Sequence, residues 1–483
     1  MEMSNREILN MVSVEELLNK NDEIIRNIRE INDQIYREEG KQKKAIIVTY
    51  GCQMNEHDSE KLDAMIQDMG YVMVKKLDQA DLVIFNTCCV RENAELKVYG
   101  NLGRIKHLKE TKKDLVLAVC GCMMQQPHVV EAIKKQYKYV DLVFGTHNLH
   151  NFPSLLEETL SSHKQVVEVW ESEGDVVEGL AINRKKDIKA YVNVMYGCDN
   201  FCAYCIVPYT RGRERSRQPE DILEEIQDLV NNGVKEITLL GQNVNSYGKT
   251  LESPMDFADL MRKVNDIKGI ERIRFMTSHP KDISDKLLET MAECEHVCEY
   301  LHLPIQAGSN RILKAMNRKY TREQYLEIVD KARKLMPDVS ISTDLIIGFP
   351  GETRADFEET LSLMKEVQFD SAFTYIYSKR TGTPAALIEP QIDEAEKHQR
   401  MTELLAMFNP MVNEKIQSHQ DEILEVLVEG ASKSSDQILM GRTRQHVTVN
   451  FEGDLSLTGK LVKVKATQPK KFSIFGELVE VVR

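Results

Sequence analysis

Three closely spaced cysteines place the strongest constraint on how this chain can fold. Cys198, Cys202 and Cys205 have the spacing C-x3-C-x2-C in the stretch YGCDNFCAYC. Thiolates at this spacing can bind three irons of a cubane cluster and leave the fourth iron without a protein ligand. A structural zinc site would need a fourth ligand, usually from a second C-x2-C pair, and the neighbouring sequence supplies none. The loop is therefore expected to hold an iron–sulfur cluster with one open coordination position.

Length and composition limit the class of protein. The chain has 483 residues, which favours several domains because one core rarely grows past about 250–300 residues. Its net charge of -13 repels polyanions, so any nucleic-acid binding must come from local basic patches. We find no apolar run of membrane-spanning length and no secretory signal. These features predict a cytoplasmic protein without a membrane segment, in which the ten cysteines bind metal instead of forming disulfides.

The first half of the chain alternates short apolar runs with amphipathic stretches. Residues 1–43 read as a helical extension. Residues 44–182 are then predicted to form a doubly wound α/β domain with a parallel sheet, because continuous apolar runs suit strands that are buried on both faces. The expected strands are residues 45–50, 82–86, 115–120, 139–145 and 166–170. Sheets of this kind bind ligands at the carboxyl ends of their strands.

Further cysteines fall at those predicted strand ends. Cys52 follows the first strand, Cys88 and Cys89 follow the second, and Cys120 and Cys122 close the third. One such thiol could be ordinary core packing, but thiols at three successive turns predict a second metal-binding site. A glycine precedes both Cys52 and Cys122, which favours Cys122 over Cys120 as a ligand. The residues alone leave the choice between Cys88 and Cys89 open.

Residues 183–416 repeat a strand-and-helix pattern. Six such units predict an open, partial TIM-like (β/α)6 barrel with its site at the carboxyl ends of the strands. The expected strands are residues 191–198, 236–241, 272–278, 300–306, 341–352 and 372–378, and a helical stretch is expected over 392–423. Cys294 and Cys298, four residues apart, are interpreted as packed core thiols.

Residues 417–483 alternate apolar and polar positions between glycine and aspartate turns, which predicts a small β-barrel. Basic side chains there could contact phosphates, although acidic neighbours make a solvated surface the alternative; they are Arg442, Arg444, His446, Lys463, Lys465 and Lys470. Four alternating arginines follow the three-cysteine loop and could contact phosphates or form ordinary salt bridges; they are Arg211, Arg213, Arg215 and Arg217.

Several motifs resemble known families. The C-x3-C-x2-C loop resembles the radical S-adenosylmethionine (SAM) superfamily, and the last module resembles the OB-like TRAM domain. TYGCQMN, NTCCVRENAE and GCMMQ resemble the N-terminal signature of the methylthiotransferases. This resemblance implies a second 4Fe-4S cluster on Cys52, Cys88 and Cys122, beside the radical SAM 4Fe-4S cluster on the later triad. The chain departs from the usual pattern at Cys89 and Met124, where smaller residues are common.

The resemblance also implies contacts to SAM, which serves the family both as radical source and as methyl donor. The positions that match are Tyr204, Gly241, Gln242, Ser309, Arg311, Arg318 and Gly348, of which Ser309, Arg311 and Arg318 could contact either SAM or the substrate. The glycine motif GFPGE is weak alone, but its place after the three-cysteine loop strengthens it.

The resemblance extends from about Lys43 to the end and is closest to the bacterial branch that acts on tRNA. That branch converts N6-isopentenyladenosine beside the anticodon to its 2-methylthio form, which a splayed loop base permits. It implies tRNA (its anticodon loop), an electron donor such as flavodoxin or ferredoxin, and a sulfur donor or cluster-assembly protein as partners; we expect a monomer. The alternatives are sister branches acting on threonylcarbamoyl-adenosine or a ribosomal-protein aspartate, and an RNA-binding iron–sulfur sensor without turnover.

Overall fold

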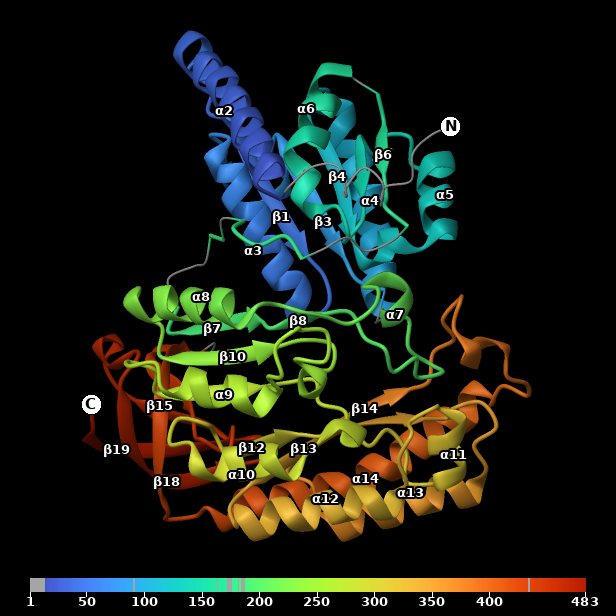
Figure 1. The fold of residues 1–483 in the computed structure, drawn as a ribbon, viewed down its shortest axis with the longest axis vertical. Coiled ribbons are helices and arrows are strands. Elements are labelled where there is room, and N and C mark those ends of the chain that lie inside the picture. Colours follow the sequence, from blue (N-terminus) through green and yellow to red (C-terminus); the bar gives the residue numbers. More distant parts are fainter. Residues whose placement is uncertain are drawn as a thin grey trace. The chain divides into compact units, whose positions relative to one another are not determined.

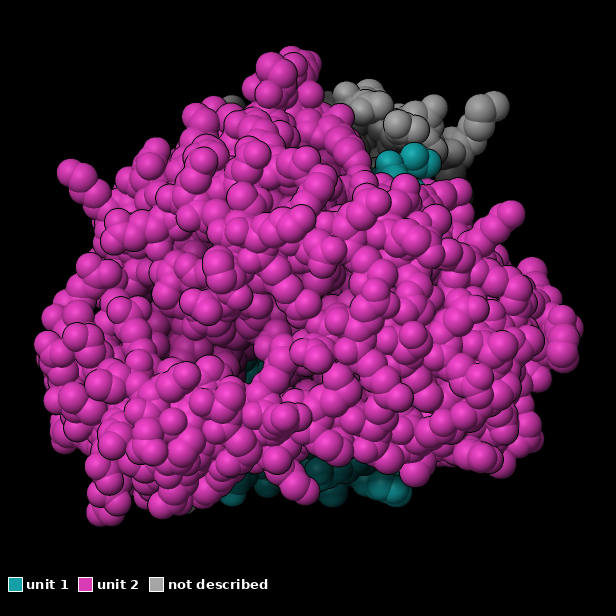
Figure 2. All heavy atoms as spheres, turned by 90° about the horizontal axis from the view of Figure 1, so that it is seen from below, with its two compact units in different colours: residues 1–185, 196–199, 206–215 teal, residues 186–195, 200–205, 216–483 magenta. Residues whose placement is uncertain are grey.

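The chain divides into two compact units (Figure 2). In the computed structural model, unit 1 comprises residues 1–185, 196–199 and 206–215, and unit 2 comprises residues 186–195, 200–205 and 216–483. The structure describes residues 14–89, 92–162, 164–171, 176–180, 182–183, 187–432 and 435–483. Part of the extension predicted for residues 1–43, and residues 184–186 beside the boundary predicted at 182–183, lie outside that description. Every helix in the described ranges is too short or too polar to cross a bilayer.

Unit 1 contains the doubly wound sheet that the sequence predicts. All neighbouring strands are parallel, in the order β2-β1-β3-β4-β5-β6. The strands are β1 (Lys44–Thr49), β2 (Val72–Met73), β3 (Leu82–Thr87), β4 (Val116–Gly121), β5 (Leu142–Phe144) and β6 (Val166–Glu168). The sequence did not predict β2, because a two-residue strand leaves no periodic pattern.

Helices cover both faces of this sheet (Figure 1). One face packs on α2 (Val14–Glu39), α3 (Gln53–Asp68) and α6 (Phe152–Ser162), and the other on α4 (Glu92–Thr111) and α5 (Pro127–Gln136). Alternate residues of β3 therefore enter different cores: Leu82 and Ile84 on the first face, Val83 and Phe85 on the second. Short 3-10 turns complete unit 1: η1 (Leu77–Gln79), η2 (Cys122–Gln125) and η3 (Leu149–Asn151).

Unit 2 begins with six parallel strands in two three-stranded sheets, ordered β11-β10-β7 and β12-β13-β14. A parallel bridge between Ile273 and Val297 continues the strand order from β11 toward β12. The strands are β7 (Lys189–Asn193), β10 (Glu236–Leu240), β11 (Arg272–Phe275), β12 (Tyr300–His302), β13 (Ser340–Ile347) and β14 (Ser371–Ile376). This arrangement confirms the predicted partial barrel.

Helices follow these strands and bury one face against them (Figure 1). They are α8 (Pro219–Asn231), α9 (Phe257–Asn265), α10 (Asp285–Glu293), α11 (Asn310–Ala315), α12 (Arg322–Leu335), α13 (Arg354–Val367) and α14 (Glu394–Ser418). Capping boxes fix where α9, α12 and α13 begin, since side chain and backbone satisfy each other there. The last helix ends at Ser418, five residues before the predicted limit of 423. Short elements lie around the three-cysteine loop: β8 (Met195–Tyr196), α7 (Val207–Thr210) and β9 (Arg215–Ser216).

The C-terminal module is a closed five-stranded barrel with the order β15-β16-β17-β19-β18, as the sequence predicts. Its strands are β15 (Ile423–Ser432), β16 (Ser435–Arg442), β17 (Thr448–Glu452), β18 (Leu461–Lys470) and β19 (Ser473–Val481). Alternate residues such as Val426, Val428, Val462 and Val464 fill its interior. Closure leaves no unpaired edge strand among the described residues of this module.

Candidate functional site

The predicted thiols of unit 1 gather at the carboxyl edge of its sheet. Cys52 follows β1, Cys88 follows β3 and Cys122 follows β4. Strand β1 lies between β2 and β3, so the chain reverses its direction of sheet growth there. Such a reversal opens a crevice at the strand ends, where doubly wound folds bind ligands. The topology therefore places these three cysteines where a ligand of unit 1 is expected.

The environment of these thiols favours the thiolate form that iron requires. The pKa of Cys52 falls to about 6, first because Cys88 hydrogen-bonds to its side chain and also because Arg211 lies nearby. Cys52 is the N-cap of α3, and the backbone amides of Met54 and Asn55 lower its pKa further. The pKa of Cys122 is lowered by a hydrogen bond from Cys89 and by Arg211. The donor chemistry thus fits an iron–sulfur cluster.

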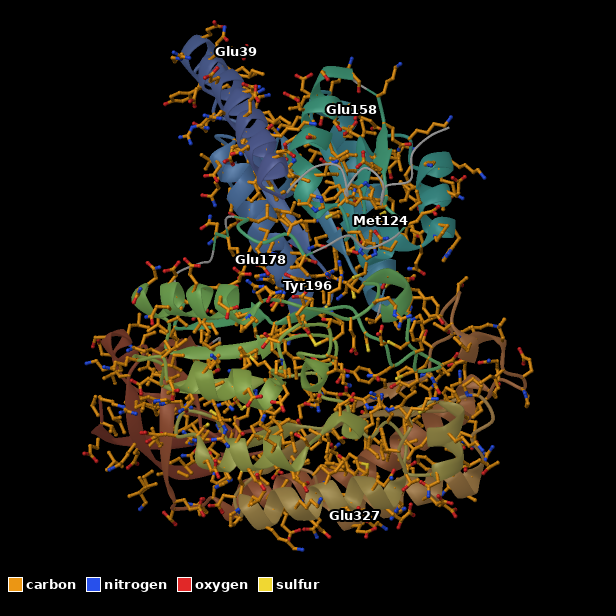
Figure 3. All side chains as sticks on the ribbon, viewed as in Figure 1. Glu39, Met124, Glu158, Glu178, Tyr196 and Glu327 are labelled. Carbon is orange, nitrogen blue, oxygen red and sulfur yellow. The ribbon has the colours of Figure 1, made fainter. Side chains whose placement is uncertain are left out.

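The two spare cysteines of these turns differ from the ligands expected. The pKa of Cys89 is raised well above its ordinary value, because its hydrogen bond to Cys122 and its burial favour the neutral thiol. Its Sγ also donates to Thr210 Oγ1 at 3.8 Å. Cys120 lies in the core on the opposite face of the sheet from Cys122, as expected for a packed residue. Met124, labelled in Figure 3, is fully buried just after Cys122.

Glycines allow the close approach of these turns. Gly51 and Gly121 have φ angles of 108° and 93°, which side-chain-bearing residues rarely adopt. A Cβ at Gly51 would lie 2.3 Å from Cys88 Cβ, and one at Gly121 would lie 2.4 Å from Thr87 O. The thiols are neighbours and do not enclose one point: in the described ranges, no three Cys, His, Asp or Glu side chains could hold a single metal ion. Cubane ligands each bind a different iron.

A buried asparagine ties the first two turns together. Asn55, in the first turn of α3, donates from Nδ2 to Tyr50 O and to Thr87 O, each at 2.9 Å. These carbonyls lie beside Gly51 and Cys88, so one side chain fixes the spacing between the turns after β1 and β3. The sequence interpretation missed this role. Its only signal was the position of Asn55 three residues after Cys52, at the start of a helix.

Arg211 is buried beside Cys122 in unit 1. Its Nε donates to Cys122 Sγ at 3.0 Å and its Nη2 donates to Asn55 Oδ1 at 2.6 Å. The guanidinium also forms an ion pair with Asp58, 2.8 Å from Oδ2. The residue is only 6% exposed. Its charge is therefore satisfied inside unit 1, whereas the sequence had placed Arg211 among candidate phosphate contacts.

A pocket of unit 1 reaches the same arginine. Its lining includes Asp58, Lys61, Arg211, Arg215 and Tyr196, the last of which is labelled in Figure 3. Lys61 Nζ donates to Tyr196 Oη at 3.3 Å. Because Arg211 is paired with Asp58, the further cations on the lining are Lys61 and Arg215.

The three-cysteine loop begins in unit 1 and continues in unit 2. In unit 1, the amide of Cys198 donates to Gly212 O at 3.1 Å. In unit 2, the amide of Cys205 donates to Cys202 O at 2.9 Å. The amide of Ala203 donates to Met316 O, also at 2.9 Å. These backbone bonds hold each part of the loop to the unit that carries it.

Arg318 makes a similar contact to the second thiol of this loop. Its Nη1 donates to Cys202 Sγ and to Tyr204 Oη, each at 3.3 Å. Its Nε donates to Tyr320 Oη at 2.8 Å and its Nη2 to Pro304 O at 2.9 Å. Arg318 is buried, so its donors are committed to these partners. The structure thus places two predicted SAM-site residues, Tyr204 and Arg318, against a predicted cluster ligand.

The carboxyl ends of the barrel strands carry buried polar atoms that have no hydrogen-bond partner within the described chain. They come from the ends of β7 and from the turns after β10, β11 and β12: Asn193, Gln242, Asn243, Ser278, His279 and Gln306. Buried polar groups are nearly always paired in folded proteins. Such a concentration at one edge of a barrel fits a polar ligand such as SAM.

The other predicted SAM contacts also lie at this edge. Gly241 directly follows β10, and a Cβ there would lie 2.6 Å from Met195 Cγ. Gly348 directly follows β13 and donates its amide to Glu352 Oε1 at 3.3 Å. Ser309 is the N-cap of α11, but its hydroxyl donates to Asp356 Oδ1 at 2.6 Å. Ser309 is therefore engaged with protein.

Salt bridges occupy most of the arginines that follow the three-cysteine loop. Arg213 binds Asp199 through two nitrogens, at 2.6 and 3.2 Å, and is 64% exposed. Arg217 is buried and pairs with Glu225 at 2.6 Å. With the Arg211 pair, three of the four arginines take the salt-bridge alternative that the sequence had left open.

Two predicted phosphate contacts of the C-terminal module are turned toward protein. Arg442 pairs with Glu429 at 2.6 Å, and Arg444 pairs with Glu299 at 2.7 Å while also donating to Val297 O. In return, Arg274 donates to Arg444 O at 2.8 Å. The Arg442–Glu429 pair lies within the module, whereas the Arg444 and Arg274 contacts join the module to β11 and to the residues before β12. Alternating charge in the sequence did not reveal this role.

Lys463 and Lys465 keep more exposure. Lys463 pairs with Glu480 at 2.8 Å and Lys465 with Asp421 at 3.3 Å, and their side chains are 45% and 47% exposed. Exposed pairs of this kind are weak and exchange readily for other partners. Cys294 and Cys298 are both buried in the interior of unit 2, as predicted.

Family models cover most of the chain. Residues 192–364 match the radical SAM superfamily, residues 44–145 match an uncharacterized protein family, UPF0004, and residues 417–479 match the TRAM domain. The three matches follow the same order as the sheet of unit 1, the partial barrel and the closed barrel.

Curated relatives are similar over nearly the whole chain. A tRNA-2-methylthio-N(6)-dimethylallyladenosine synthase of Clostridioides difficile (strain 630) is 59% identical over 465 residues, which cover 96% of this chain and 97% of that protein. The protein of the same name from Alkaliphilus oremlandii (strain OhILAs) is 57% identical over 96% of this chain and 98% of that protein. The protein of the same name from Acetivibrio thermocellus (strain ATCC 27405) is 57% identical over 94% of this chain and 95% of that protein.

A solved structure shares the fold at low identity. The radical S-adenosylmethionine methyltransferase TsrM from Kitasatospora setae, with cobalamin and a [4Fe-4S] cluster bound, superposes with a TM-score of 0.53 at 12% identity. The match covers 72% of this chain and 77% of that chain. At this identity the likeness concerns the fold alone.

Proposed function

The chain belongs to the family of tRNA-2-methylthio-N(6)-dimethylallyladenosine synthases (MiaB), which are radical SAM methylthiotransferases, and we propose that it inserts a methylthio group at C2 of N6-isopentenyladenosine beside the tRNA anticodon. The observation that carries this proposal is the second group of thiols, at the carboxyl edge of the unit 1 sheet. Cleaving SAM needs one cluster, so a second thiolate site supports a reaction that also handles sulfur.

The family implies a 4Fe-4S cluster and SAM, and Cys198, Cys202 and Cys205 match its cluster motif. We propose a second 4Fe-4S cluster on Cys52, Cys88 and Cys122. We propose Cys88 and not Cys89 because Cys88 is the first cysteine after NT, as in the methylthiotransferase signature. Its Sγ also lies close to the Gly51-Cys52 turn, 2.6 Å from where a Cβ at Gly51 would stand. When bound, the clusters and SAM supply reductive C–H activation, sulfur and a methyl group; the protein supplies position and exclusion of water.

For SAM we propose a site at the carboxyl ends of the barrel strands. Gln242 offers a buried, unpartnered Oε1 to a ligand amine. Gly241 and Gly348 directly follow β10 and β13 and pack against Met195 and Lys397 where a Cβ would not fit. Tyr204 and Cys202 share hydrogen bonds from Arg318. Ser309 and Arg318 act by holding Asp356 and Cys202 in place.

For tRNA, we propose phosphate contacts from Lys463 and Lys465 on β18, because their exposed ion pairs can be exchanged for phosphate. Arg213 is exposed and fits the same role, whereas Arg211, Arg442 and Arg444 are held by carboxylates of the protein. The net charge of -13 makes such local contacts necessary. A low-potential electron donor, such as flavodoxin or ferredoxin, and a sulfur donor complete the proposed reaction of a monomeric enzyme.

The division of labour between the two triads tests this function. We expect the triple variant of Cys52, Cys88 and Cys122 to alanine to cleave SAM under anaerobic reducing conditions but to form no methylthio nucleoside. The variant of Cys198, Cys202 and Cys205 should lose both activities. Methylthio product from the first variant would refute the sulfur-handling role, and loss of SAM cleavage in it would refute the separation of the two sites.

A further inference from the structure

We propose that Arg211 is a positioning residue whose cation, together with Asp58, sets the reduction potential of the cluster on Cys52, Cys88 and Cys122. This inference rests on the proposed second cluster. The guanidinium donates to Cys122 Sγ at 3.0 Å and lies 2.8 Å from the Asp58 carboxylate. Asn55 accepts from the same guanidinium at 2.6 Å, which fixes its orientation.

The two charges act on the cluster because both side chains are largely buried. Arg211 and Asp58 are both buried, so solvent screens them little. Hydrogen bonds to ligand sulfurs and the net charge nearby are main determinants of the potential of an iron–sulfur cluster. Reduction adds one negative charge, which the guanidinium stabilises and the carboxylate disfavours.

Changes to the two residues are therefore predicted to shift the reduction potential in opposite directions. Removing the charge of Arg211 should make the cluster harder to reduce, whereas removing the charge of Asp58 should make it easier to reduce. A residue that only maintains packing would not give opposite shifts from the two members of one ion pair. Asn55 holds both the arginine and the turns that carry Cys52 and Cys88, so the cation keeps its place relative to those ligands.

The test uses the full chain with Cys198, Cys202 and Cys205 changed to alanine, so that only the unit 1 cluster remains. After anaerobic reconstitution, the reduced fraction is followed by electron paramagnetic resonance during a redox titration. Arg211→Gln should lower the ratio of reduced to oxidised cluster at least about tenfold at fixed potential, a shift of about 59 mV for one electron. Arg211→Lys should shift it less than half as far, and Asp58→Asn should shift it upward.

Lys112→Gln is the matched control. Lys112 pairs with Asp81 at 3.3 Å, and Asp81 precedes β3, at the opposite edge of the same sheet from the cysteines. Lys112→Gln removes one positive charge from unit 1, as Arg211→Gln does, and should shift the potential less than half as far.

The outcomes separate this inference from the proposed function. A background protein that binds no iron would refute the second cluster itself. Iron that is present with an unchanged potential in Arg211→Gln, or shifts of one sign in both Arg211→Gln and Asp58→Asn, would overturn the inference. If Arg211→Gln retains no iron, Asp58→Asn decides: an upward shift supports the inference and an unchanged potential overturns it.

Discussion

Gly121→Ala should remove one cluster from the protein without touching any thiol. Gly121 has φ 93° and ψ -170°, a backbone region that is essentially restricted to glycine and costs other residues about 1–3 kcal/mol. The added Cβ would also lie 2.4 Å from both Asn86 Oδ1 and Thr87 O. Overpacking of this kind costs roughly 1–3 kcal/mol more. The sum, about 2–6 kcal/mol, is large against the roughly 5–15 kcal/mol that stabilise a typical protein.

The strain falls on the ligand turns, because the displaced Thr87 peptide directly precedes Cys88. We therefore expect reconstituted Gly121→Ala to bind about four irons per chain where the parent binds about eight, the content of one and two cubanes. The melting temperature of the iron-free chain should fall by about 2–4 °C per kcal/mol of lost stability. Gly103→Ala, in α4, is the control: its Cβ meets no atom within 4 Å, so alanine should be neutral or stabilising. Full iron content in Gly121→Ala would refute the proposed spacing of these turns.

Three further changes test other parts of the account. Arg318→Gln removes a hydrogen-bond donor from Cys202 and from Pro304 O, so SAM cleavage, measured as 5′-deoxyadenosine, should fall at least about tenfold. Arg354→Gln, at an exposed arginine, is its control. Equal cleavage rates in the two variants would contradict the positioning role of Arg318. The double variant Lys463→Gln, Lys465→Gln should weaken tRNA binding and reduce the slope of log K against log [salt] by about two. Lys331→Gln on α12 is the control and should change neither. An unchanged slope in the double variant would exclude phosphate contacts from these lysines. Cys294→Ala and Cys298→Ala should each keep about eight irons, and a fall to about four would assign them as ligands.

The sequence predicted the features that repeat or fall at strand ends. Continuous apolar runs located β1, β3 and β4, and the chain order of strands and helices then placed Cys52, Cys88 and Cys122 at one edge. Alternation was enough for the closed C-terminal barrel because each of its strands buries one face.

Contacts between distant residues were not accessible in this way. Arg211 lies 156 residues from Asn55, and an arginine-rich stretch looks equally like a phosphate site or a set of salt bridges. Arg444 likewise finds Glu299, 145 residues away. Packing, burial and the pairing of opposite charges decide which partner each arginine contacts. None of these leaves a periodic pattern in the sequence.

The substrate tests the central claim most directly. Burial of an isopentenyl group contributes a few kcal/mol, at about 0.8 kcal/mol per buried carbon. That contribution separates modified from unmodified adenosine by roughly 100-fold.

The reconstituted protein should be given isopentenylated tRNA, the same tRNA unmodified, and threonylcarbamoylated tRNA, each with SAM, reductant and sulfide. Nucleoside mass spectrometry then measures the methylthio product. We predict product chiefly from the isopentenylated tRNA. Equal turnover of the unmodified tRNA, or preference for the threonylcarbamoylated tRNA, would contradict the proposed substrate.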